Sequence, residues 1–134
     1  TLNLESTSMN STATFYPAPG DMPFSSAVRA GGFLMLSGQI PFGEDKRPLT
    51  GPIEEQTHAV LKAIAARLEA VGSSLDDVVK ANIWLSDLAH FDAFNKVYAS
   101  YFKEGRYPVR SLVQAQLVFG VGVEIEVQAL DKAV

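Results

Sequence analysis

Residues 121–130 read Val-Gly-Val-Glu-Ile-Glu-Val-Gln-Ala-Leu, with apolar and polar side chains alternating over most of the stretch. Successive side chains of a β-strand point to opposite faces. The alternation therefore predicts a strand with one apolar face and one face that carries Glu124 and Glu126. Because such a strand buries only one side, the rest of the chain has to supply a layer that covers it.

Four more segments have the composition of strands. Residues 109–117 come before the first stretch, and a short glycine-containing turn joins the two. Residues 78–85 alternate in the same way. Residues 33–37 are a continuous apolar run between glycines, which predicts a buried strand. A turn at Gly31-Gly32 should pair that strand with residues 26–29 in a hairpin, whereas residues 16–20 are rich in turn formers.

Two helices separate these strands. The first is expected to use Gly51 as its N-cap, to place Pro52 at its first position and to end before Gly72. The second should begin after an Asp87 cap and run to about Lys103. The order β-β-α-β-α-β-β predicts an α+β fold, with two helices on one face of a mixed sheet of four to six strands. The other face is partly apolar, so an oligomer is expected.

Composition narrows the classes of function. The chain has 134 residues, no cysteine, two histidines and a formal net charge of −4. This length fits one domain, which we place at residues 11–134. Residues 1–10 are expected to be a disordered tail or a remnant that is not native. The charge disfavours nucleic acid, and the few histidines disfavour a metal site. Apolar runs shorter than a membrane span favour a cytoplasmic protein.

Arg110, Glu124 and Glu126 are the residues most suited to chemistry. A guanidinium binds a carboxylate through two parallel hydrogen bonds, and a carboxyl group with a raised pKa can move protons. Arg110 could equally form a weak surface ion pair, and the glutamates could line a solvent-facing edge. Asn95 could orient a polar group or face solvent. The sequence pattern alone leaves these alternatives open.

Several motifs occur together in one order along the chain. They are Leu36-Ser37-Gly38-Gln39-Ile40-Pro41, Asp77-Val78-Val79-Lys80, Asp87-Leu88 with Phe91 and Asn95, Tyr107-Pro108-Val109-Arg110-Ser111, and Val123-Glu124-Ile125-Glu126. In these motifs the chain resembles the reactive-intermediate deaminase family, RidA, also called YjgF. The resemblance implies a chorismate-mutase-like fold and a homotrimer, in which the sheets form a central barrel-like core and the sites lie between subunits.

The resemblance also implies an activity, the hydrolysis of enamines and imines such as 2-aminoacrylate to a 2-keto acid and ammonia, without a metal or cofactor. Arg110 would bind the substrate carboxylate, and Glu124 would position or protonate the water and the leaving nitrogen. Ser37 and Gly38 would line the pocket, and Asn95 would support it.

Two positions depart from the pattern of the family. Phe24 stands where a tyrosine is common, and Leu112 stands where a cysteine is frequent. Both would line the substrate pocket and make it more apolar. They leave open two other functions: a carboxylate-binding or interaction module without catalysis, and a deaminase of larger 2-aminomuconate-type compounds from aromatic degradation.

Overall fold

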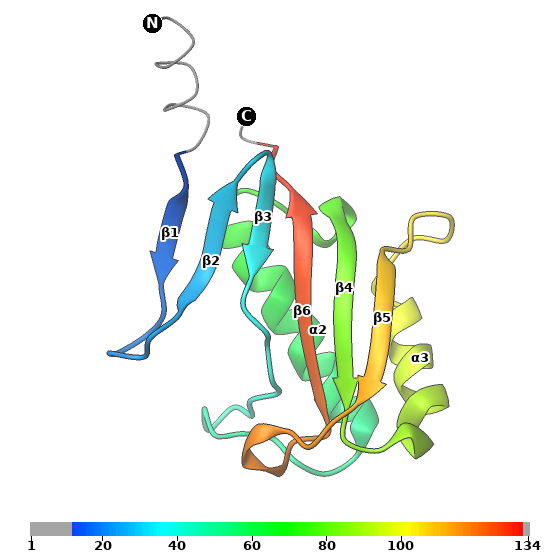
Figure 1. The fold of residues 1–134 in the computed structure, drawn as a ribbon. Coiled ribbons are helices and arrows are strands. Elements are labelled where there is room, and N and C mark those ends of the chain that lie inside the picture. Colours follow the sequence, from blue (N-terminus) through cyan, green and yellow to red (C-terminus); the bar gives the residue numbers. More distant parts are fainter. Residues whose placement is uncertain (1–11, 133–134) are drawn as a thin grey trace, which may run out of the picture.

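The computed structural model describes residues 12–132, so the expected tail at residues 1–10 lies outside the described part. Its elements follow one another along the chain as Figure 1 shows. The strands are β1 (Thr14–Pro17), β2 (Ser25–Ala30), β3 (Phe33–Leu36), β4 (Val78–Leu85), β5 (Val109–Gln114) and β6 (Val123–Leu130). The helices are α2 (Ile53–Ala70) and α3 (Phe91–Ala99), with 3₁₀ turns η1 (Leu75–Asp77), η2 (Leu88–His90) and η3 (Val118–Gly120).

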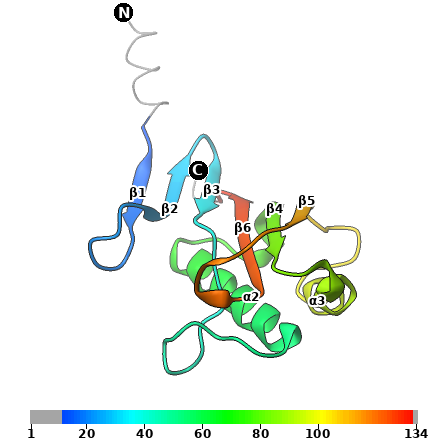
Figure 2. The ribbon, with the colours of Figure 1, turned by 60° about the horizontal axis from the view of Figure 1, so that its bottom comes forward.

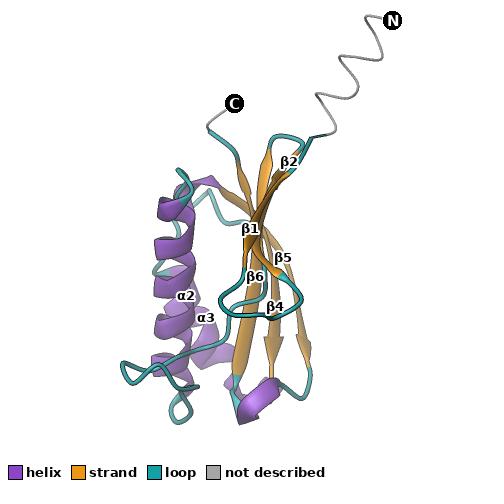
Figure 3. Ribbon diagram, turned by 90° about the vertical axis from the view of Figure 1, so that its left-hand side faces the viewer, coloured by secondary structure: helices purple, strands orange, loops and turns teal. Residues whose placement is uncertain are grey.

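The six strands form one mixed sheet in the order β1-β2-β3-β6-β4-β5. β5 runs parallel to β4, and the other neighbouring strands are antiparallel. Both long helices lie on the same side of the sheet, so the protomer has two layers (Figure 3). This confirms the predicted α+β architecture. The trimer and its barrel-like core concern the assembly of subunits and stay predictions.

The core lies between β6 and α2. Ile125 on β6 is fully buried, and the apolar face of α2 packs opposite the sheet. Four α2 residues on that face are fully buried, namely Val60, Leu61, Ile64 and Leu68. Figure 2 shows α2 lying beneath the strands at the centre of the sheet. The strand predicted from the alternation along residues 123–130 is therefore confirmed, because one set of its side chains enters this core.

Some expected boundaries were wrong. The turn-rich segment at residues 16–20 begins inside a strand, because β1 pairs with β2 as an additional edge strand. α2 starts at Ile53 and Pro52 is its N-cap, one residue later than expected. The strand from Val109 ends at Gln114, not at residue 117. The two differences in the strands arise from strand pairing, which local composition does not contain.

The second helix is shorter than predicted. Asp87 caps the 3₁₀ turn η2 by accepting from the backbone N–H of Ala89 at 2.8 Å, and α3 begins only at Phe91. α3 ends at Ala99 instead of near Lys103. After it, the backbone N–H of Tyr101 bonds to the carbonyl of Tyr98, a three-residue spacing that tightens the chain out of the α-helix.

The helix-free face of the sheet keeps exposed apolar side chains. Leu34 and Leu36 on β3 are buried, but Met35 between them is 37% exposed, so the expectation of a wholly buried strand was wrong for one protomer. The same face carries other exposed apolar residues, which are Phe15, Val109, Val113 and Leu130. An uncovered apolar face of this kind favours self-association. No helix among residues 12–132 is long and apolar enough to cross a bilayer.

Gln56 offers a test of how the start of β6 is fixed. Its side chain is buried, accepts from the backbone N–H of Gly122 at 2.7 Å and donates to the carbonyl of Gly51 at 2.8 Å. Gln56→Leu would leave both backbone groups without partners, so we expect a loss of about 1–3 kcal/mol in unfolding free energy. Urea unfolding measures this loss. The exposed Gln116→Leu is the control, and equal stability of the two variants would contradict the prediction.

Candidate functional site

Arg110 lies on the helix side of the sheet. It is in register with the buried Ala81 of β4, and neighbouring residues in register share a face. Its Nη2 donates to Oδ1 of Asn95 at 2.8 Å. Asn95 is therefore turned toward Arg110 and supports the guanidinium, which was one of the two alternatives that the sequence left open.

Aromatic rings of α3 surround the same guanidinium. Its central carbon lies 5.1 Å from the ring centre of Tyr98, 5.9 Å from that of Phe91 and 6.0 Å from that of Phe94. Because these residues are three and four positions apart, they share one face of the helix. Their electron-rich faces stabilise the positive charge without neutralising it. The contact of these aromatic residues with Arg110 was missed from the sequence, although their spacing around Asn95 was a usable signal.

The guanidinium has no acidic partner in the part of the chain that the structure describes. Among residues 12–132, no carboxylate lies within ion-pair distance of Arg110. The side chain is nevertheless partly buried, and a surface hollow of about 280 Å³ opens beside it. A partly buried cation with free N–H donors is suited to an anionic ligand. We call Arg110, Asn95 and Leu112 the arginine half-site; Leu112 is in register with Ile83 and faces the same side.

Glu124 lies on the opposite side of the sheet. It is in register with Trp84 of β4, and both alternate with residues that enter the core. Burial, and then the negative charge of Glu126, raise the pKa of the Glu124 carboxyl above its ordinary value. Glu126 is held by Asn82, whose Nδ2 donates to Oε1 at 2.8 Å. Glu124 thus combines partial burial with a like charge, the environment that suits a carboxyl for proton transfer.

Gly38 approaches the Glu124 carboxyl closely. Gln39 and Ile125 exchange two backbone hydrogen bonds of 2.8 and 3.0 Å, which bring residues 37–39 alongside β6. A Cβ atom at position 38 would collide with the Glu124 carboxylate. Glycine therefore lets this backbone lie against the acid while the Glu124 side chain keeps its present position.

Ser37 belongs to the segment of residues 37–39, and it connects that segment to Ser25, the residue after Phe24. The Ser37 hydroxyl donates to the carbonyl of Ser25 at 2.6 Å, so the chain after β3 is tied to the start of β2. Phe24 directly precedes that start and is 50% exposed. We call Phe24, Ser37, Gly38 and Glu124 the glutamate half-site.

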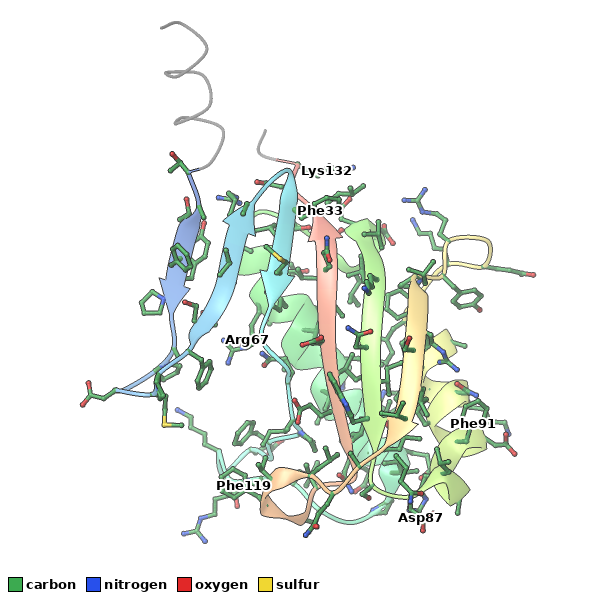
Figure 4. All side chains as sticks on the ribbon, in the orientation of Figure 1. Phe33, Arg67, Asp87, Phe91, Phe119 and Lys132 are labelled. Carbon is green, nitrogen blue, oxygen red and sulfur yellow. The ribbon has the colours of Figure 1, made fainter. Side chains whose placement is uncertain are left out.

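The two half-sites do not share a face of the protomer. Arg110 and Asn95 lie where β5 meets α3, whereas Glu124 faces away from the helices. Figure 4 shows Phe91, which contacts Arg110, on the β5 side of the molecule, and Phe119, in the loop that leads to β6, on the side of β3. One protomer therefore holds the predicted site residues in two groups. Within residues 12–132, no cluster of three or more acidic or histidine side chains could hold a metal ion.

The six-stranded sheet, its two helices and these half-sites define an α+β protein of the YjgF type. Residues 17–131 match the family model described as Endoribonuclease L-PSP. The chain belongs to this family, which comprises the YjgF, RutC and RidA proteins. The family resemblance inferred from the motifs is therefore confirmed.

Known relatives are similar in sequence to this chain over most of their length. The mitochondrial protein MMF1 of Saccharomyces cerevisiae is 37% identical over 94% of this chain and 87% of its own. A RutC family protein of Pyrococcus horikoshii is 43% identical over 78% of this chain and 83% of its own. The crystal structure of YyfA from Yersinia pestis, described as a Rid family protein of unknown function, has a TM-score of 0.82 and 35% identity, and the alignment covers 90% of this chain and 100% of that one.

The pKa of Glu124 provides a test of the glutamate half-site. Glu126→Gln removes a like charge two residues away on the same face, so we expect the pKa of Glu124 to move down toward its ordinary value. Carboxyl-carbon NMR titration would follow this change. Glu69→Gln, on the exposed surface of α2, is the control. An unchanged Glu124 titration in the Glu126→Gln variant would show that the charge of Glu126 has no part in the shift.

Proposed function

We propose that this protein hydrolyses reactive enamines and imines, namely 2-imino acids related to 2-aminoacrylate, to 2-keto acids and ammonia. The observation that carries the proposal is the guanidinium of Arg110, which is partly buried, oriented by Asn95 and without a carboxylate partner among the described residues. Membership of the YjgF/RidA family supports the same reaction class.

Arg110 would bind the substrate carboxylate through a pair of N–H donors. Asn95 takes one N–H of Nη2 and so limits rotation of the guanidinium plane. The aromatic rings beneath it stabilise the charge but offer no anion, so the remaining donors stay available. Binding at this point would place the imine carbon at a defined distance from the protein groups that act on it.

Glu124 would move the protons of the reaction. Water adds through its oxygen to the imine carbon, and the C–N bond of the resulting carbinolamine then breaks to leave a 2-keto acid and ammonia. The Glu124 carboxylate would accept a proton from the attacking water and pass it to the imine nitrogen, and it would then carry the hydroxyl proton of the carbinolamine to the leaving nitrogen, so that both water protons end on ammonia. A raised pKa lies closer to neutral pH, where one carboxyl group can both accept and donate a proton. Water and these side chains suffice for the chemistry, so we propose no cofactor.

The complete site would form between protomers. Arg110 and Glu124 lie on opposite faces of one sheet, and the helix-free face has exposed apolar residues that a neighbouring copy would cover. We therefore propose a homotrimer in which the arginine half-site of one subunit meets the glutamate half-site of the next. A small imino or keto acid and a second copy of the chain are the proposed partners. Nucleic acid and membranes are not among them.

Two alternative functions would use the same pocket. Phe24 and Leu112 would suit a module that binds carboxylates without turnover, or a deaminase of 2-aminomuconate-type compounds. Keto-acid binding without imine hydrolysis would favour the first, and hydrolysis restricted to the larger compounds would favour the second. The cytoplasmic location expected from the sequence stays a prediction. The name of the yeast relative MMF1 places that protein in mitochondria.

The role of Arg110 is tested by its removal. Imino acids generated with an amino-acid oxidase decay in water, and we expect the protein to accelerate that decay. Arg110→Ala should lower the catalysed rate by about 100-fold, because hydrogen bonds to charged groups are strong. Arg106→Ala is the control, since Arg106 is exposed and its side chain bonds only to the backbone carbonyl of Asp76 among the described residues. Full activity in Arg110→Ala would refute the proposal.

The shared site is tested by mixing two inactive variants. Arg110→Ala and Glu124→Gln chains, unfolded together and refolded as mixed assemblies, should recover activity. With equal amounts, roughly one quarter of the sites would pair an intact arginine half-site with an intact glutamate half-site. Each variant refolded alone is the control. If a site were contained in one chain, every site in the mixture would carry a defect, and no recovery would be seen.

A further inference from the structure

The hollow beside Arg110 is walled largely by apolar surface. Its lining residues are Asn95, Tyr98, Ala99, Tyr107, Pro108 and Arg110. Ala99 is the last residue of α3 and is exposed, and Tyr107 is 50% exposed. The hollow is thus bounded by a small side chain on one side and by an aromatic ring on the other.

The size of the hollow exceeds the needs of the smallest imino acids. A volume of about 280 Å³ lies against the guanidinium, whereas 2-aminoacrylate carries only a methylene group beyond its reacting atoms. Phe91, 40% exposed and in contact with the same guanidinium, adds apolar surface beside Arg110. Leu112 faces the same side of the sheet. Apolar walls of this extent favour a ligand that removes them from water.

We propose that the natural substrates are 2-imino acids with a bulky apolar side chain, aromatic or branched, and that the hollow between α3 and residues 107–108 holds this side chain. The inference rests on the proposed function, because it takes the substrate carboxylate to lie on Arg110. With the carboxylate there and the imine nitrogen turned toward the Glu124 of a neighbouring subunit, the remaining substituent on the imine carbon lies against the walls of the hollow.

Ala99 would then determine specificity. It stands one helical turn after Asn95, so both face the hollow from α3. A methyl group at this position leaves the space open, whereas a larger side chain would fill it. Because one methylene in an apolar pocket changes selectivity by roughly tenfold or more, a single enlargement is enough for a measurable effect.

The experiment compares imines made from alanine, leucine and phenylalanine by an amino-acid oxidase, with kcat/KM measured for each. The unmodified protein should prefer the leucine and phenylalanine imines. Ala99→Leu should lower the ratio of kcat/KM for the phenylalanine imine to that for the alanine imine by roughly tenfold. Ala70→Leu is the matched control, because Ala70 is the exposed last residue of α2, and it should leave the ratio unchanged.

The outcomes separate this inference from the proposed function. Hydrolysis of the alanine imine in preference to the larger ones would overturn the inference and leave the deaminase proposal standing. An equal loss for all three imines in Ala99→Leu would also overturn it, since that result indicates a structural effect, and thermal unfolding of the variant would identify one. Failure to hydrolyse any imine would overturn the proposed function itself.

Discussion

The pairing of β6 with β3 on one side and β4 on the other is the constraint on which the rest of the structure depends. It places Ile125 in the core opposite α2 and so turns Glu124 and Glu126 to the helix-free face. The same register, carried through β4 to β5, turns Arg110 toward α3. Because the side-chain period of a strand is two, a slip of one residue would exchange these faces.

The chemistry available on each face follows from this arrangement. On the helix side, the aromatic residues of α3 hold a cation without supplying a counter-charge, so Arg110 keeps its capacity for an anion. On the other side, partial burial and Glu126 raise the proton affinity of Glu124. The protomer therefore separates the two groups to which the proposed reaction assigns anion binding and proton transfer. The exposed apolar residues around Glu124's face suggest how a second copy would bring them together.

Membership of the family supports the proposed reaction, and the pocket residues of this chain bear on its substrate. The family match covers residues 17–131, a range that includes every residue of both half-sites. Phe24 and Leu112 are apolar in the half-sites, and the hollow beside Arg110 is walled by Ala99 and Tyr107. Under the proposed function, these features would bear on the choice of substrate, whereas Arg110 and Glu124 would carry out the reaction.

The sequence by itself determined the layers of the fold and the family, because hydrophobic periodicity and short motifs can be read directly along the chain, and it supplied the residues proposed for both half-sites. It missed β1, whose pairing depends on β2, and it extended α3 past Ala99, where three-residue hydrogen bonds replace the helix. Only the tertiary structure decided that Asn95 bonds to Arg110, that Gly38 meets Glu124, and that the arginine and the acid face opposite sides. Such contacts join residues far apart in the chain, and register between strands fixes them.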